Sequence, residues 1–409
     1  MAPDSQSHLE KSRSGWLTRG VLGIGVASLC GDWGYETATA LLPALLAGMG
    51  APAYALGVIE GVADGASTFA KLAGGWFASR PAWRKPVAVA GYLVTGITTF
   101  AFGFVGAWPQ VLAARAIGWV ARGVRGPARD VLLTGSVTPA QVGRAVGFER
   151  TMDTIGAILG PLCATALAAA ISVRVLMRWT IVPGALAALA FAALVPAGTR
   201  DEKYSALPFL TSLAKLPGEF RKFLGAVAVF GLGDFAHSLL ILRSVQLLAP
   251  NYGAMRAAAM GVGLYTFHNV VYAAASYPAG ALGDKFGRRG LLGAGYFLAA
   301  LTSLGFIFAR PELPMLAGLF GVAGLYVAIQ DTLEKSVATE LLPRELRATG
   351  FGVLASVNGV GDFVSSVIVG FLWSAVSPAA GFTYACLLTA FGGVMIFLLP
   401  RDVRPAQHI

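Results

Sequence analysis

Apolar stretches long enough to cross a membrane recur along the whole chain. About 20 helical residues span the ~30 Å hydrocarbon core of a bilayer, and runs of that length alternate with short polar segments as far as residue 399. They predict twelve transmembrane helices, at 18–46, 53–78, 86–106, 108–136, 141–171, 176–197, 221–248, 257–282, 289–309, 313–340, 345–374 and 379–399. The expected fold class is therefore an all-α membrane protein.

Charged residues are scarce for a chain of this length. Of 409 residues, 56% are hydrophobic and 13% are charged, and the mean hydropathy is +0.67. A soluble domain carries about 25% charged residues. This composition excludes a soluble globular enzyme and makes the lipid bilayer the main partner of the chain.

The net charge of +10 would also suit a nucleic-acid-binding protein, but its distribution favours another explanation. Lysine and arginine gather in alternate connecting segments. The segments on the other side hold only Arg174, Arg178, Arg256 and Arg310. This bias is typical of cytoplasmic loops, so we expect both termini in the cytoplasm and no nucleic-acid partner.

The two halves of the chain repeat each other. "RAVGF" at 144–148 returns as "RATGF" at 347–351, and the segment at 74–92 is similar to that at 280–296. Such repeats are typical of transporters built from two parallel helical bundles. We expect pseudo-symmetric six-helix bundles at 1–197 and 221–409. A cytoplasmic linker with one short amphipathic helix would occupy 198–220.

The segment "GALGDKFGRR" at 280–289 resembles the signature that joins the second and third helices of each half in the major facilitator superfamily. The matching positions are Gly280, Asp284, Gly287, Arg288 and Arg289, with Gly75 and Arg80 in the first copy. The first copy departs from the signature, because Ser79 stands where an acid is expected. The resemblance implies a secondary transporter that rocks two bundles around a central site, with this loop as a conformational switch.

The residue types in this loop suit such a switch. Glycine permits the sharp turn, Asp284 can stabilise a helix N-terminus, and Arg288 and Arg289 are expected to anchor the loop at the cytoplasmic surface. A rival interpretation makes both loops mere positively charged anchors.

Three predicted helices carry acids four residues apart. An ionisable group at membrane depth costs about 2.5–3.5 kcal/mol, and this spacing places both acids on one helix face. The pairs are Asp32 and Glu36, Glu60 and Asp64, and Glu149 and Asp153. We predict that these faces converge on an aqueous cavity for protons and substrate. The alternative is fixed structural pairing, such as Glu149 or Asp153 with Arg150, or Asp130 with Arg129 or Arg144.

Arg115 resembles the arginine of the family's fourth helix, which the resemblance links to proton transfer in exporters. We expect its partner to come from the first helix, with Asp32 favoured and Glu36 next. A neighbouring cation and burial act in opposite directions on the pKa of a carboxylate, which would let a proton be taken up or released during transport.

The second half has fewer buried charges. Its buried acids are Asp234, Asp331, Glu334 and Asp362, of which Asp234, Asp331 and Asp362 are the candidate cavity acids. Tyr265 and Asn269 align with Glu60 and Asp64 of the first half. We therefore expect the first bundle to handle charge and the second to supply shape and hydrogen bonds. His237 and His268 could relay protons, but packing is the favoured interpretation.

The stretch "GAILGP" at 156–161 resembles the exporter signature of the family in Gly156, Gly160 and Pro161. Small residues let helices approach closely, and proline removes an internal hydrogen bond and permits a bend. The resemblance implies proton antiport.

The sequence lacks a nucleotide-binding Gly-Lys-Ser/Thr motif and the usual metalloenzyme motifs, and Cys30, Cys163 and Cys386 lie in apolar spans as small hydrophobes. We expect no enzyme activity, cofactor or metal site. The favoured function is a monomeric, proton-coupled exporter of a small molecule in the cell inner membrane. An importer of a small metabolite or siderophore-like ligand is the alternative, and a divalent metal transporter is third. A membrane sensor would not need paired buried charges, and an intramembrane enzyme would need a catalytic set that is not found.

Overall fold

The computed structural model describes residues 15–52, 54–168, 170–197 and 209–399, and nearly all of them are helical. The first half contains α2 (Arg19–Gly48), α3 (Tyr54–Ala78), α4 (Pro81–Ala101), α5 (Trp108–Gly135), η1 (Pro139–Gln141), α6 (Val142–Leu167), α7 (Val173–Trp179) and α8 (Ile181–Leu194). The rest contains α9 (Phe209–Ala214), α10 (Gly218–Gly231), α11 (Ser238–Tyr252), α12 (Ala254–Phe286), α13 (Arg288–Ile307), α14 (Leu313–Leu341), η2 (Arg344–Leu346), α15 (Arg347–Ala375) and α16 (Pro378–Leu398). The all-α fold class is confirmed.

Each predicted span coincides with one helix or with two consecutive helices. The span at 176–197 consists of α7 and α8, which meet at Thr180, and the span at 221–248 consists of α10 and α11, separated by residues 232–237. At this second break a Cβ added to Gly233 would lie 2.8 Å from the carbonyl oxygen of Ala385. The backbone there packs directly against α16, which requires glycine.

Five of the described helices meet both the length and the hydropathy expected of a membrane span. They are Val173–Leu194, Arg288–Ile307, Leu313–Leu341, Arg344–Ala375 and Pro378–Leu398. Of the other long helices, α3, α5 and α6 each carry several charged residues. The helices with the most buried charge are therefore those that hydropathy identifies least well.

The chain forms two compact units, Met1–Lys215 with Leu342–Val353, and Leu216–Leu341 with Leu354–Ile409. The short helix α9 falls in the predicted linker, of which residues 198–208 lie outside the described part of the chain. The domain boundaries given above stay a prediction.

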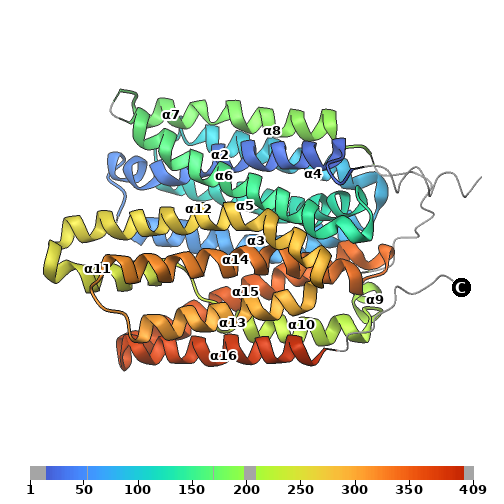
Figure 1. The fold of residues 1–409 in the computed structure, drawn as a ribbon. Coiled ribbons are helices and arrows are strands. Elements are labelled where there is room, and N and C mark those ends of the chain that lie inside the picture. Colours follow the sequence, from blue (N-terminus) through green and yellow to red (C-terminus); the bar gives the residue numbers. More distant parts are fainter. Residues whose placement is uncertain (1–14, 53, 169, 198–208, 400–409) are drawn as a thin grey trace, which may run out of the picture. The chain divides into compact units, whose positions relative to one another are not determined.

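In the first unit α2 lies between α6 and α8, and α5 packs against α3 and α4 (Figure 1). Small residues set the distance between α2 and α6. A Cβ added to Gly160 would lie 2.7 Å from the backbone nitrogen of Thr37, and one added to Gly156 would meet the carbonyl oxygen of Leu29. The predicted close approach at these glycines is confirmed.

In the second unit α12 packs against α14, and α13 packs against α14 and α16. Aromatic rings fill its interior: Phe230 stacks on Tyr296 at 3.7 Å between ring centroids, and Phe306 stacks on Phe382 at 5.4 Å. Gly287 joins α12 to α13 with φ +102°, a backbone conformation that side chains other than glycine rarely adopt. The predicted glycine turn is confirmed.

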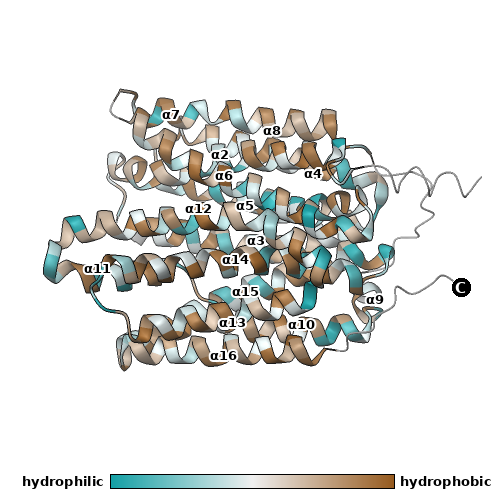
Figure 2. Ribbon diagram, in the orientation of Figure 1, coloured by the Kyte–Doolittle hydropathy of each residue, from teal (hydrophilic) through white to brown (hydrophobic). Residues whose placement is uncertain are grey.

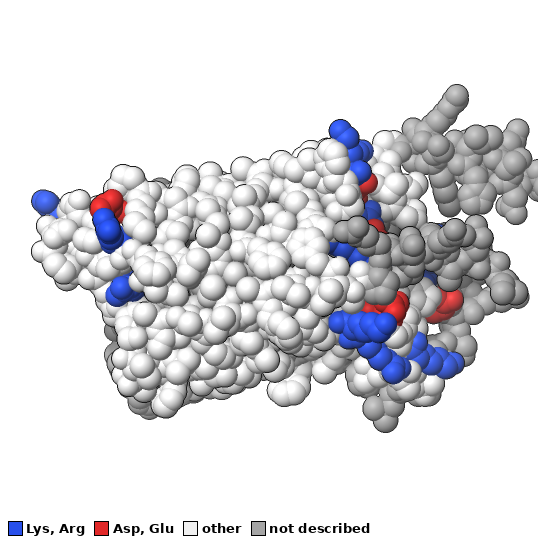
Figure 3. All heavy atoms as spheres, turned by 60° about the horizontal axis from the view of Figure 1, so that its bottom comes forward, with Lys and Arg blue, Asp and Glu red and all other residues white. Residues whose placement is uncertain are grey.

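The helices present hydrophobic residues along most of their length (Figure 2). On the face drawn in Figure 3, the described Lys, Arg, Asp and Glu residues lie near the helix ends, and the wide middle shows other residues. Phe69, Phe286, Phe363 and Phe371 are each 68–74% exposed. Exposed aromatic surface of this extent is unusual for a soluble monomer and suits contact with lipid.

Candidate functional site

A row of arginines on α5 organises the first unit. The helix carries Arg115, Arg122, Arg125 and Arg129, and three of them recur every seven residues, which places them close to one helix face. Acids from three different helices meet these three: Glu60 of α3, Asp32 of α2 and Glu149 of α6. Three of the predicted acids thus meet the same face of α5, and their convergence on an aqueous cavity stays a prediction.

Arg115 pairs with Glu60. One guanidinium nitrogen lies 2.9 and 3.0 Å from the two carboxylate oxygens, while another donates to the hydroxyl of Thr39 at 3.1 Å. The guanidinium also lies 4.7 Å from the centroid of the Tyr35 ring. The Arg115 side chain is 2% exposed and the Glu60 side chain is 33% exposed, so the acid is the more accessible partner of this pair.

The predicted pair of Arg115 with Asp32 is wrong. Asp32 instead faces Arg122, at 2.8 and 3.1 Å between nitrogens and carboxylate oxygens. The reason is the register between α2 and α5. The two helices run in opposite directions, so Arg115 is level with Thr39, two helical turns away from Asp32. Glu36, the second choice, makes no ion pair within the described part of the chain.

Glu149 is the most enclosed acid of the first unit, with 0% exposure. It accepts from the hydroxyl of Ser28 at 2.8 Å and from two nitrogens of Arg150 at 2.8 and 2.9 Å, and a nitrogen of Arg129 lies at 2.6 Å. Asp153 also lies 3.2 Å from Arg150. The alternative of structural pairing therefore describes the contacts of Glu149 and Asp153, and it also holds for Asp130 and Arg129, at 3.3 Å.

Asp64 differs from its predicted companion Glu60. The residue is exposed, and no ion pair with it is found among the described residues. Its backbone carbonyl accepts from the hydroxyl of Thr68. The two acids of α3 therefore have different surroundings, one bound to an arginine and one open.

A polar cluster of the second unit lies around the break between α10 and α11. Asp234 accepts from Tyr326 and from Gln330, both at 3.1 Å. The Tyr326 hydroxyl also lies 3.0 Å from Nε2 of His237, whose ring is 4.8 Å from that of His268. Tyr265 in turn stacks on His268, at 5.5 Å between centroids.

Two other predicted residues of the second unit adjoin this cluster, because Asn269 is hydrogen-bonded to His268 and the Tyr272 ring lies 6.5 Å from that of His268. Asp331 accepts from the hydroxyl of Tyr272, Asn269 is half-buried and Asp362 is exposed. The structure therefore brings together Asp234 and Tyr265, through two histidines for which packing was the favoured role.

Glu334 is one of the buried acids predicted in the second half, although it was not assigned to the cavity. The residue is 2% exposed, and its two oxygens accept from Tyr296 at 2.6 Å and from Asn358 at 2.7 Å. These donors come from α13 and α15, so no local motif could have revealed them. Within the described part of the chain, Asp234, Asp331 and Glu334 make no ion pair with lysine or arginine. Glu60, Asp32 and Glu149 of the first unit thus pair with arginines, whereas neutral donors bind Asp234, Asp331 and Glu334 of the second.

The switch motif forms a tight cluster in the second unit. Arg288 lies 2.8 Å from Asp284 and 2.7 Å from Glu340, and it is only 5% exposed. Two acids thus enclose the Arg288 guanidinium, and its role as an anchor at the cytoplasmic surface stays a prediction. Gly280 is buried, and Arg289 is half-buried.

The first copy of the motif has different contacts. Ser79, at the position expected for an acid, donates to the carbonyl of Trp76 at 2.6 Å, and Arg80 covers the Trp76 ring at 4.6 Å. A Cβ added to Gly75 would lie 2.8 Å from the carbonyl oxygen of Ala348, within the same compact unit. Arg84, which the repeat aligns with Arg288, donates from Nε to the carbonyl of Ala78 at 2.9 Å.

The described residues contain no group of three or more His, Cys, Asp and Glu side chains that could hold a metal ion. The three cysteines are free.

Comparisons with known proteins agree on one family. Residues 24–249 and 223–409 match the sequence profile of the Major Facilitator Superfamily. An uncharacterized MFS-type transporter of Methanocaldococcus jannaschii is 27% identical over 389 residues, which cover 94% of this chain and 95% of that protein. An uncharacterized protein of Mycobacterium tuberculosis is 28% identical over 405 residues, which cover 95% and 94%.

Solved structures show the same fold at low identity. The fucose:proton symporter FucP of E. coli matches with a TM-score of 0.72 and 14% identity, over 92% of this chain and 98% of that one. The human organic anion transporter MFSD10 (TETRAN) matches with a TM-score of 0.69 and 14% identity, over 92% and 99%.

Proposed function

The chain belongs to the major facilitator superfamily of multi-pass membrane transporters, and on that premise we propose that it exports a small molecule in exchange for protons by alternating access. We further propose that it acts in the cell inner membrane with both termini in the cytoplasm, because of the distribution of its lysines and arginines.

The ion pair of Glu60 with Arg115 is the observation that carries the proposal. A proton and a guanidinium compete for the same carboxylate, because protonation removes the charge that the arginine needs. Glu60 is 33% exposed while Arg115 is 2% exposed. A proton from water can thus reach the acid, and protonation leaves a buried cation without its partner. Such an imbalance favours a rearrangement of the helices or the binding of another group to Arg115.

The neighbouring acids have complementary roles in this proposal. Glu149, fully buried and bound to two arginines, acts as a fixed part of the scaffold. Three further acids exchange protons in this proposal, as Glu60 does. They are Asp32, which pairs with Arg122, and the unpaired Glu36 and Asp64. In the second unit Asp234 and Glu334 are the acids that a proton could neutralise without displacing a cation.

Export is favoured over import by the resemblance of Gly156, Gly160 and Pro161 to the exporter signature, and by the close packing of these glycines against α2. Import in symport with protons is the second candidate, because the structurally similar FucP is a fucose:proton symporter and the same acid–arginine chemistry can serve either direction. Transport of divalent metal is less well supported, since Asp32, Glu60 and Glu149 are already bound by arginines.

The test measures proton movement in everted, respiring vesicles that contain the wild-type protein. Lipophilic cations, organic anions and divalent metals are added in turn to vesicles with an acidic interior, and the interior pH is followed with a fluorescent dye. We expect one class to release protons from the vesicles. Glu60→Gln should abolish this release, and Glu312→Gln, a change at an exposed acid, should leave it intact.

Two outcomes would contradict the proposal. Proton release by Glu60→Gln at the wild-type rate would remove Glu60 from coupling. Accumulation of a compound that depends on a proton gradient of the opposite sense would identify an importer.

A further inference from the structure

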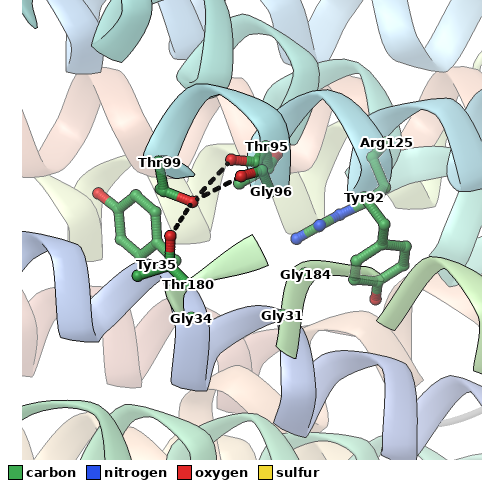
Figure 4. Close-up of a pocket in the computed structure, with 10 residues that line it drawn as sticks. All are labelled: Gly31, Gly34, Tyr35, Tyr92, Thr95, Gly96, Thr99, Arg125, Thr180 and Gly184. Carbon is green, nitrogen blue, oxygen red and sulfur yellow. Dashed lines mark hydrogen bonds between the residues drawn. The ribbon is translucent and has the colours of Figure 1, made fainter. Parts of the chain in front are cut away.

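A small cavity lies inside the first unit, between α2, α4, α5 and α8 (Figure 4). Its lining comprises Gly31, Gly34, Tyr35, Tyr92, Thr95, Gly96, Thr99, Arg125, Thr180 and Gly184. The space between these residues holds about one particle of the size of a water molecule.

Arg125 is the only charged residue in this lining, and it differs from the other arginines of α5. Arg115, Arg122 and Arg129 each face a carboxylate within 3 Å. Arg125 is 3% exposed, and no carboxylate of the described residues lies within ion-pair distance of it. Its Nε and Nη1 atoms are buried without a hydrogen-bond partner among the described groups.

The guanidinium of Arg125 is held by the face of an aromatic ring. It lies 3.8 Å from the centroid of Tyr92, and in Figure 4 it extends over that ring into the cavity. A desolvated cation–π contact is stabilising. It provides no acceptor for the N–H groups, and an unpaired buried charge is strongly destabilising. The contact therefore offsets only part of the cost of burying Arg125.

The other lining groups cannot neutralise this charge. The hydroxyls of Thr95, Thr99 and Thr180 each lie within 3.0 Å of a backbone carbonyl, and those of Tyr35 and Tyr92 point away from the centre of the cavity in Figure 4. The missing group is thus a hydrogen-bond acceptor with negative charge. Its size is limited, because a Cβ added to Gly184 would already lie 2.7 Å from the Cα of Gly96.

We propose that this cavity binds a monatomic inorganic anion, of the size of chloride, against the N–H groups of Arg125. The anion balances the fourth arginine of α5 as carboxylates balance the other three. Polyatomic anions such as phosphate exceed the space. The site is separate from the Glu60–Arg115 pair and does not depend on the direction of transport.

The first test measures the melting temperature of the purified protein in chloride and in gluconate at equal ionic strength. Gluconate is too large for the cavity. We expect the wild type to melt a few degrees lower in gluconate and to recover with saturation as chloride is added. Arg19→Gln, which removes an exposed arginine, should respond like the wild type, whereas Arg125→Gln should melt at the same temperature in both salts.

The second test uses the wild type alone, so it is decisive even if Arg125→Gln does not fold. Crystals grown in bromide should show an anomalous peak beside the Arg125 guanidinium. Equal melting temperatures of the wild type in both salts, a response to chloride that does not saturate, or water in place of the bromide peak would each overturn the proposal.

Discussion

Replacing Glu149 by glutamine tests how much the buried charge network contributes to stability. The side chain keeps its shape but loses its charge, and an amide N–H₂ group takes the place of one acceptor oxygen. In the wild type both carboxylate oxygens of Glu149 accept from arginine, and one of them also accepts from Ser28. In the variant the new amide N–H₂ group faces another hydrogen-bond donor, and Arg129 and Arg150 have one carboxylate fewer to pair with.

The magnitude follows from these contacts. Removing one partner of a buried ion pair costs about 3–5 kcal/mol. Asp130 and Asp153 remain within 3.3 Å of Arg129 and Arg150, respectively, and offset part of the loss, so we expect about 3 kcal/mol. For a unit of this size the melting temperature falls roughly 2–4 °C per kcal/mol, so the expected shift is roughly 6–12 °C.

The assay is thermal unfolding of the purified protein in detergent, followed by tryptophan fluorescence. The matched control is Glu219→Gln, since Glu219 and Lys222 form a pair with 33% and 61% exposed side chains, and an exposed pair contributes at most about 1 kcal/mol. If Glu149→Gln has the same melting temperature as the control variant, the reasoning is refuted, because the arginines then do not need the charge of Glu149.

Two further predictions concern helix packing and register. Gly160→Ala should lower the stability by about 1–3 kcal/mol, because the new Cβ would lie 2.7 Å from a backbone nitrogen of α2; Gly61→Ala, with no neighbouring atom within 4 Å, should leave the melting temperature unchanged or higher, and equal effects of the two would contradict the packing. In a double-mutant cycle, Asp32→Asn and Arg122→Gln should couple by about 0.5–3 kcal/mol, whereas Asp32→Asn and Arg115→Gln should be additive; the reverse result would restore the pairing predicted from the sequence.

Most of the fold could be predicted from the sequence because the features that identify a membrane helix are local. Their length and hydropathy depend only on neighbouring residues, and each predicted span has its helix. The break at residues 232–237 was not predicted, because its cause is the approach of α16 at Gly233, a contact with a segment about 150 residues further along the chain.

The acids of the candidate site could be predicted from the sequence, but the arginine that each acid contacts could not. The acids of α2, α3 and α6 were found from their spacing, which is a property of one helix. The partner of Asp32 depends on the vertical register of α5 against α2, and a shift of two turns exchanges Arg115 for Arg122. The partners of Glu334 could not be predicted for the same reason, since Tyr296 and Asn358 lie on two other helices.

The central claim is that Glu60 carries the proton that couples transport, and exchange in proteoliposomes tests it most directly. With the substrate that the vesicle assay identifies, Glu60→Gln should still exchange labelled for unlabelled substrate at close to the wild-type rate, since exchange needs no net proton movement. It should lose transport driven by an imposed pH gradient. A Glu60→Gln protein that retains gradient-driven transport with accompanying proton movement would contradict the account.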